Sequence, residues 1–318
     1  MSDLPVGSGH PPLRAPVTSP LRGAVWRAVG RLPEFVVIWV PLLLCAGQVV
    51  VFTLWTTVVS FTPSTLMPAT GWVGLRNYQA MLASRNWHIA FHNLLIFGAG
   101  FVLLAIAVGL LLAVLLDQRI RGENVLRTIF LYPMAVSFVV TGTVWSWLLN
   151  PGIGVQKLVQ GLGWSGFRFD WLVRPDMAIY TIVIAAVWQA SGFAMALFTA
   201  GLRSVEPDLI KAAQIDGAGP WRTYLRVILP TLWPIVIAVL VILLQFAIKA
   251  FDLVRALTDG GPGISTQLPT LVVYDFMFQR GLLGRGTAAA VLMLLTLLAV
   301  LAPYAVWKRV QKRRAARA

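Results

Sequence analysis

Six stretches of the sequence contain no Asp, Glu, Lys or Arg over 22 to 27 consecutive residues. They are Phe35–Phe61, Phe91–Leu116, Thr128–Asn150, Met177–Leu202, Val227–Ile248 and Gly286–Trp307. A helix needs about 20 residues to cross a hydrocarbon layer about 30 Å thick, so each stretch is long enough to span a membrane. A charged residue at the centre of such a helix costs about 3 kcal/mol. We therefore predict an all-α integral membrane protein with six transmembrane helices.

The overall composition supports the same class. Of the 318 residues, 58% are hydrophobic and only 12% are charged, whereas soluble proteins carry about 25% charged residues. The net charge of +14 would suggest nucleic-acid binding in a soluble protein. In a membrane protein it reflects topology and contact with anionic lipid headgroups, so we predict membrane lipid and no nucleic acid as a partner.

Few residues are available for covalent cross-links or metal binding. Cys45 is the single cysteine, which excludes a disulfide within the chain. His88 and His92 lie four residues apart, as two ligands on one helix face would, but no H-E-x-x-H motif surrounds them. We interpret them as residues near the membrane interface and predict no metal site.

The basic residues predict the orientation of the chain. With six crossings, both termini lie on the same side as the loops Asp117–Arg127 and Arg203–Arg226, and these segments hold 17 Lys and Arg over 80 residues. The opposite loops hold 9 over 92 residues. The positive-inside rule therefore places both termini in the cytoplasm. We expect three parts, which are a partly disordered tail over residues 1–34, a six-helix domain over 35–307 and a basic tail over 308–318.

No motif for covalent chemistry or nucleotide hydrolysis is present. The phosphate-binding pattern G-x-x-x-x-G-K-S/T is missing, so we predict that this chain is not an enzyme and has no catalytic residues of its own. A lone G-x-G-x-x-G at Gly161, Gly163 and Gly166 lies in a loop between two spans and lacks the preceding strand of a dinucleotide site. We interpret these glycines as turn residues.

The loop over residues 203–226 is the most informative segment. Pro207 suits the first turn of a helix, which we expect to run to about Asp216 and to break at Gly217. A second helix should begin near Pro220 and continue into the fifth span. The first helix has an apolar face with little bulk, made of Leu209, Ile210, Ala212 and Ala213. Such a face suits either the groove of a partner protein or the membrane surface, and periodicity alone leaves both open.

The residue string in this loop resembles a known motif. Lys211-Ala-Ala-Gln-Ile-Asp-Gly-Ala218, followed by Tyr224 and by Ile228-Leu-Pro230, is similar to the EAA motif of ATP-binding-cassette (ABC) importer permeases. The resemblance implies a coupling helix that docks on a cytoplasmic ATPase subunit, which binds ATP and magnesium in place of this chain. The matching positions are Lys211, Ala212, Ala213, Asp216, Gly217, Ala218, Leu229 and Pro230. Lys211 departs from the family pattern, which has an acidic residue there.

A second segment narrows the resemblance. Phe251 to Gly263 reads F-D-L-V-R-A-L-T-D-G-G-P-G, and its Gly260, Gly261, Pro262 and Gly263 demand tight turns. It resembles the corresponding outer loop of the maltose-permease-like subunit of carbohydrate importers. The resemblance implies a sugar as cargo. The segment Ile248–Asp252 is similar to the corresponding segment in permeases that import glucose-type or mannose-type monosaccharides, or glucosides.

The resemblance also implies a set of partners and a location. They are a second, homologous permease subunit, two cytoplasmic ATPase subunits and an extracytoplasmic solute-binding protein, in the cytoplasmic (inner) membrane of a bacterium or archaeon. Two alternatives remain open at this point. In the first, the importer carries an amino acid, a polyamine or phosphate in place of a sugar. In the second, the chain is a self-sufficient secondary carrier.

Depth in the membrane selects candidate residues for a sugar path. Gln189 lies about 18 Å into the fourth span, close to the midplane, and Gln245 lies about 21 Å into the fifth. Both amides suit sugar hydroxyls, with hydrogen bonding between helices as the alternative. Lys249 is expected near the outer surface, where snorkelling is its ordinary role. Asp252, three residues on, is within reach of an ion pair with Lys249 if both lie on one helix face, which would form an outer gate.

Overall fold

The computed structural model describes residues 34–118 and 121–315, and these contain helices and no strand. The chain divides into two units, residues 1–55 and 56–318, which are considered separately. The described part of the first unit is the N-terminal portion of α2 (Glu34–Ser60). Nearly all of its large apolar side chains, including those of Leu43, Leu44 and Val49, are exposed. Such a surface is suited to lipid or to another membrane-spanning chain.

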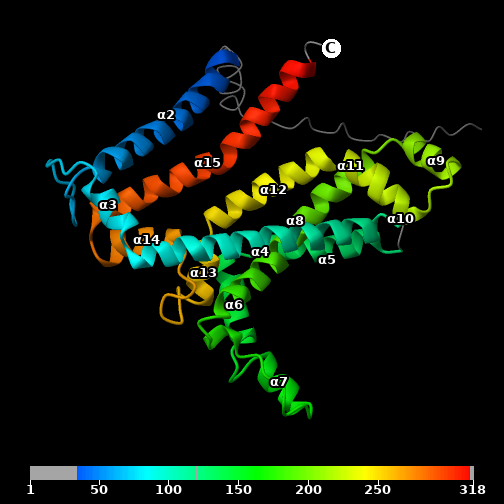
Figure 1. The fold of residues 1–318 in the computed structure, drawn as a ribbon, viewed down its shortest axis with the longest axis horizontal. Coiled ribbons are helices and arrows are strands. Elements are labelled where there is room, and N and C mark those ends of the chain that lie inside the picture. The colour runs from blue at the N-terminus through cyan, green and yellow to red at the C-terminus, as the bar shows by residue number, and fades with distance from the viewer. Residues whose placement is uncertain (1–33, 119–120, 316–318) are drawn as a thin grey trace, which may run out of the picture. The chain divides into compact units, whose positions relative to one another are not determined.

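The second unit holds the remaining helices (Figure 1). They are α3 (Arg76–Leu82), α4 (Arg85–Leu116), α5 (Glu123–Ala135), α6 (Phe138–Leu148), α7 (Val155–Gly161), η1 (Trp171–Val173), α8 (Ala178–Arg203), α9 (Pro207–Ile215), α10 (Pro220–Thr223), η2 (Tyr224–Ile228), α11 (Leu229–Thr231), α12 (Trp233–Ile248), α13 (Asp252–Leu257), α14 (Pro269–Tyr274), η3 (Asp275–Gln279) and α15 (Leu283–Ala315). Of these, η1 is a 3₁₀ turn, whereas η2 and η3 are π-helical turns.

Four helices are long and apolar enough to cross a membrane without interruption. They cover Ile38–Ser60, Arg85–Leu116, Ala178–Arg203 and Leu283–Val306. Two further spans are helix pairs with sharp bends, of 98° between α5 and α6 and of 60° between η2–α11 and α12. The six predicted stretches therefore correspond to four uninterrupted helices and two bent pairs, which give six spans if each bent pair crosses the membrane once. The sequence analysis did not predict the bends within Thr128–Asn150 and Val227–Ile248.

Both bends have local causes. After α5, Val136 is extended (φ −80°, ψ 138°), and Ser137 caps the start of α6 by accepting a hydrogen bond from the amide of Val139 at 3.3 Å. At the second bend, α11 contains Pro230 and α12 has a proline in its first turn, and proline has no amide hydrogen to continue the helical ladder. Polar capping groups and prolines thus divide two stretches that are uncharged throughout.

The core is centred on α8, which packs along α4 and also contacts α5 and α12 (Figure 1). Small residues allow two close approaches of helix backbones. A Cβ atom on Gly109 of α4 would lie 2.9 Å from the backbone nitrogen of Met195, and one on Gly192 of α8 would collide with the carbonyl group of Phe130 in α5. These contacts fix α8 against its neighbours, and α8 carries one wall of the cavity described below.

We expect Gly192→Ala to lower the free energy of unfolding by about 1–3 kcal/mol, because the added methyl group overpacks a contact with backbone atoms that cannot rotate away. Thermal unfolding of the purified chain measures the loss. Gly47→Ala in α2 is the matched control, since a Cβ atom there meets nothing within 4 Å, and alanine at a helical position is neutral or stabilising. An equal melting temperature for Gly192→Ala and the native chain would contradict the close packing.

Candidate transport cavity and coupling region

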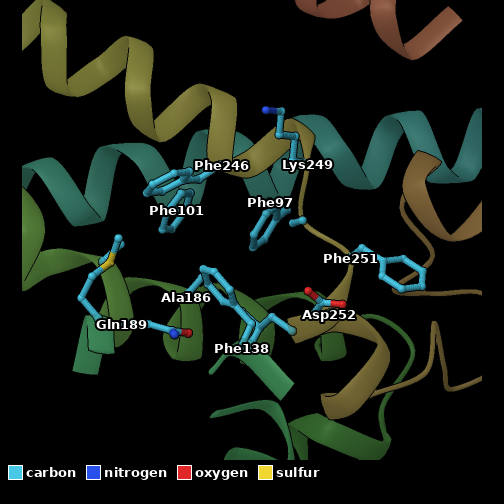
Figure 2. Close-up of a pocket in the computed structure, with 13 residues that line it drawn as sticks. Phe97, Phe101, Phe138, Ala186, Gln189, Phe246, Lys249, Phe251 and Asp252 are labelled. Atoms are coloured by element: carbon cyan, nitrogen blue, oxygen red, sulfur yellow. The ribbon is translucent and has the colours of Figure 1, made fainter. Parts of the chain in front are cut away.

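A cavity of about 240 Å³ lies where the α5–α6 bend faces α8 and the end of α12 (Figure 2). Its lining is aromatic and small apolar, with three polar or charged side chains. The full set is Phe97, Phe101, Met134, Phe138, Ala186, Gln189, Ala190, Phe246, Lys249, Ala250, Phe251, Asp252 and Leu253. Three of the four residues that the sequence selected for a path, Gln189, Lys249 and Asp252, therefore meet in one cavity. Gln245 is half-buried and does not line it.

Gln189 is the buried polar side chain that α8 contributes to the cavity, with 1% of its surface exposed. Its Nε2 donates a hydrogen bond of 2.8 Å to the carbonyl oxygen of Val136, which the bend between α5 and α6 leaves without a helical partner. Its Oε1 accepts no hydrogen bond within the described part of the chain. An acceptor in this condition costs about 1–3 kcal/mol, which a hydroxyl donor would recover. Gln189 thus makes a hydrogen bond to another part of the chain, which is one of the two roles that the sequence left open, and its contact with a sugar stays a prediction.

Five phenylalanines provide the aromatic wall, and the sequence did not single them out. Phe97 and Phe101, one turn apart on α4, stack at 5.6 Å with an interplanar angle of 3°. Figure 2 shows Phe138, Phe246 and Phe251 at the same cavity, from α6, α12 and the segment after α12. Phenylalanine is common in apolar cores, so its presence in a span gives no signal. The distinguishing observation is that five of them line the same cavity as Gln189.

The predicted ion pair between Lys249 and Asp252 is not formed in the structure. The helix ends at Ile248, Phe251 has φ −133° and ψ −63°, and Asp252 opens a new helix, α13. The two residues therefore do not share a helix face, and Figure 2 shows their side chains pointing apart. Both are exposed, and neither makes an ion pair with any residue that the structure describes. The i,i+3 argument was wrong because it assumed one continuous helix.

The loop after α8 has the two-helix form that the sequence predicted. The first helix, α9, runs from Pro207 to Ile215, and Gly217 takes the left-handed backbone angle (φ +76°) that ends it. The next helix, α10, begins at Pro220 and leads through η2 into α11, which holds Leu229 and Pro230. The motif residues Lys211 to Ala218 thus form the second half of α9 and the turn after it.

The exposed and buried faces of α9 differ from the predicted apolar face. Ala213 is buried, and Ile210 packs against the core of the same chain. Leu209 and Ile215 are instead 45% and 85% exposed. Lys211 pairs with Asp208 of the same helix at 3.0 Å, which satisfies the charge that departs from the family pattern. A partner would meet the exposed side of α9, where Leu209, Ala212 and Ile215 are accessible.

The π-helical turn η2 is tied to α4 by one side chain. The hydroxyl group of Tyr224 accepts a hydrogen bond from Nε2 of Gln118 at 3.1 Å and donates one to Oδ2 of Asp117 at 3.5 Å. Both partners directly follow the end of α4. The segment after α9 is therefore hydrogen-bonded to the end of α4. The same helix contributes Phe97 and Phe101 to the lining of the cavity.

The outer-loop motif forms the tight turn that its glycines predicted. Asp259, Gly260 and Gly263 have φ angles of +53°, +82° and +65°. The hydroxyl of Thr266 donates to the carbonyl oxygen of Gly261 at 2.8 Å, and the Thr266 amide donates to that of Gly260 at 3.1 Å. Pro262 follows Gly261 in the same turn, and this turn connects α13 to α14.

The described residues thus form long apolar helices, a small internal cavity and an exposed helix that follows α8. The family described as binding-protein-dependent transport system inner membrane component matches residues 105–317. A probable ABC transporter permease of Pyrococcus horikoshii is 36% identical over 87% of this chain and 96% of its own length. The chain belongs to this family, and it is a permease subunit of the ABC importer class.

Further relatives agree with this assignment. The xylose/arabinose import permease XacH of Haloferax volcanii is 36% identical over 72% of this chain and 73% of its own. The sn-glycerol-3-phosphate permease UgpA of Rhizobium meliloti is 32% identical over 80% and 89%. The chain was also compared with the crystal structure of a bacterial ABC transporter described as importing the acidic polysaccharide alginate. The alignment covers 92% of this chain and 99% of the other chain, with a TM-score of 0.72 and 21% sequence identity. That likeness shows a shared fold.

Proposed function

We propose that this permease subunit forms half of a transmembrane pathway for a sugar, and that Gln189 and the surrounding phenylalanines contact the cargo. The observation that carries the proposal is the cavity itself, which one buried amide and five phenylalanines line. Sugars present C–H faces that pack on aromatic rings and hydroxyls that bind amides. This chain contributes a cavity of about 240 Å³ to the pathway.

The remaining subunits belong to the same proposal. Two cytoplasmic ATPase subunits bind and hydrolyse ATP with magnesium, and one of them receives the exposed side of α9. A homologous permease completes the pathway, and a solute-binding protein delivers the sugar from outside. The family description names dependence on a binding protein, which supports the last of these partners. We place the assembly in the cytoplasmic membrane of a bacterium or archaeon, with both termini in the cytoplasm.

The proposed mechanism converts movement of α9 into movement of the spans. When the ATPases close on ATP, α9 is displaced, and the turn at Gly217 transmits the shift through α10 and η2 to α12. Tyr224 carries part of the same displacement to α4 through Asp117 and Gln118. Because α4, α8 and α12 each contribute residues to the cavity, rocking these helices alternates its access between the two sides.

Reconstituted transport tests this proposal. Vesicles holding this chain with its partner permease, the ATPases and the binding protein should accumulate labelled glucose, mannose or a glucoside when ATP is supplied. Vesicles holding this chain alone should show no uptake. Gradient-driven uptake by the isolated chain would establish a secondary carrier instead. Uptake of sn-glycerol 3-phosphate or an amino acid in preference to every sugar would replace the cargo and leave the importer class intact.

We expect Tyr224→Phe to lower the amount of sugar imported per ATP hydrolysed about fivefold, because a polar link worth about 1 kcal/mol between η2 and the end of α4 is lost. The ratio of uptake to phosphate release in proteoliposomes measures it. Tyr132→Phe, which removes an exposed hydroxyl from α5, should leave the ratio unchanged. An equal ratio of sugar uptake to phosphate release in the two variants would show that Tyr224 has no part in coupling.

A further inference from the structure

One carboxylate joins the start of α5 to the end of α8. Glu123 is the first residue of α5, and Arg203 is the last residue of α8. Oε1 of Glu123 accepts a hydrogen bond from the guanidinium group of Arg203 and another, at 3.0 Å, from Nη2 of Arg127. Among the residues that the structure describes, no other carboxylate pairs with either arginine. The three side chains form a triad in which only the contact of Glu123 with Arg203 connects two helices.

The charges of this contact match the helix ends that carry them. The start of a helix bears partial positive charge and its end partial negative charge, so a carboxylate is favoured at the start of α5 and a cation at the end of α8. The side chain of Glu123 is 24% exposed and that of Arg203 is 52% exposed. An ion pair that is partly exposed in this way adds little to overall stability. A role in holding the two helix ends together can therefore be separated from a role in folding.

Two further contacts fix α5 to α8 along their lengths. The carbonyl group of Phe130 in α5 packs directly against Gly192 of α8, where a Cβ atom would collide with it. At the far end of α5, Gln189 of α8 donates a hydrogen bond of 2.8 Å to the carbonyl oxygen of Val136. The three contacts follow opposite orders along the two helices, as in an antiparallel pair. Glu123 holds one end of this pair, and the bend after α5 lies at the other end.

This helix pair connects α9 with the cavity. Helix α9 begins at Pro207, four residues after the end of α8 at Arg203. At the far end of α5, Met134 and Phe138 lie on either side of the bend, and both line the cavity. The backbone carries a displacement of α9 to α8, whereas α5 is distant from α9 in the sequence and follows only through contacts between helices.

We propose that Glu123 is a positioning residue for transport, which makes α5 follow α8 when α9 moves. This inference rests on the proposed function, since it assumes that α9 couples ATP hydrolysis to movement of the spans. With the contact to Arg203 in place, α5 and α8 move as one unit, and the cavity wall at Met134 and Phe138 moves with them. Without the contact, the start of α5 does not follow α8 fully, so ATP is hydrolysed while the cavity changes its access incompletely.

The first test is the amount of sugar imported per ATP hydrolysed by the complete transporter in proteoliposomes. We expect Glu123→Ala and Arg203→Ala each to lower this ratio about fivefold, which corresponds to about 1 kcal/mol. The double variant should lower it no further, because both changes remove the same contact. Arg127→Ala is the matched control, since it removes an arginine from the same triad and breaks no contact between helices. Its ratio should equal that of the native chain.

A cross-link gives the sharper test, because it replaces the ion pair by a covalent tie. The chain carries Cys45→Ser, which removes its single cysteine, together with Glu123→Cys and Arg203→Cys. Before treatment the ratio should be about fivefold below the native value, as in the alanine variants. A bifunctional thiol reagent that joins the two cysteines should restore most of the native ratio. The same reagent should change nothing in chains that carry only one of the two cysteines.

Two results would overturn the proposal. One is a ratio for Glu123→Ala and Arg203→Ala that equals the ratio for Arg127→Ala. The other is a cross-linked transporter whose ratio stays low or falls further, since α5 and α8 then do not act as one unit. The melting temperature should stay close to the native value in each variant, and basal ATPase activity shows that the complex is assembled. Failure of the proposed cargo would appear separately, as absence of sugar uptake by the native complex, and the ratio is then measured with the solute that this complex imports.

Discussion

Replacing Ile215 by glutamate should abolish ATP-driven uptake. Ile215 is the last residue of α9 and is 85% exposed, although isoleucine is among the residues most often buried. A charge at the centre of an apolar contact removes at least about 2 kcal/mol of binding energy, so the affinity of the ATPase for the permease should fall about 30-fold or more. Co-purification of the ATPase with the permease measures the loss directly, and uptake in vesicles should fall with it.

Leu162→Glu is the matched control. Leu162 follows α7 on the opposite side and is 81% exposed, so the same change in charge and polarity is made at a similarly accessible leucine. That variant should keep its ATPase and its uptake. Ile215→Leu, which retains an apolar side chain, should also keep both. If Ile215→Glu binds the ATPase as tightly as the native chain does, α9 is not the docking element, and an interfacial helix on the membrane remains the better description.

The sequence predicted elements that depend on local chemistry. Freedom from charge marks each span, because the cost of a charged residue in hydrocarbon acts at every position along the helix. The two helices after α8 were equally predictable, since Pro207 suits a first helical turn and Gly217 a left-handed end. These signals lie within a few residues of the feature that they determine.

The bend between α5 and α6 depends only in part on local chemistry, because the Ser137 cap alone does not identify a bend. The carbonyl oxygen of Val136, which has no helical partner there, accepts a hydrogen bond from Gln189, 53 residues further along the chain. Nothing near Val136 identifies that donor, so the stretch looked like one continuous span. The same limit applies to Lys249 and Asp252, whose spacing implied a shared helix face although the helix ends before both of them.

The candidate site was predictable only in its polar part. An uncharged amide at mid-membrane depth is unusual, so Gln189 was selected from the sequence. Gln245 met the same criterion and proved to lie off the cavity, because depth fixes the position along a helix and not the direction around it. The phenylalanines carry no sequence signal of their own, and only the fold places all five along one cavity.

That difference between the two glutamines gives a decisive experiment. We expect Gln189→Leu to lower the uptake of sugar about 10- to 100-fold, because the loss of a hydrogen-bonding partner for a hydroxyl in a buried site costs on the order of 1.5–3 kcal/mol. Gln245→Leu makes the same chemical change in the neighbouring span and should alter uptake less than about threefold. Initial rates at several sugar concentrations, in vesicles with excess binding protein, distinguish the two.

The anchoring of Val136 by Gln189 requires a second readout, because the leucine variant also loses that hydrogen bond. If the glutamine serves only to hold the α5–α6 bend, Gln189→Leu should lower the melting temperature and slow the uptake of every cargo by the same factor. If it contacts the sugar, the loss should be largest for substrates with a hydroxyl at the contacted position and smaller for their deoxy analogues, with ATPase stimulation by the binding protein retained. Uniform losses across hydroxylated and deoxygenated sugars would assign Gln189 to the scaffold and would leave the aromatic rings as the cargo-binding part of the cavity.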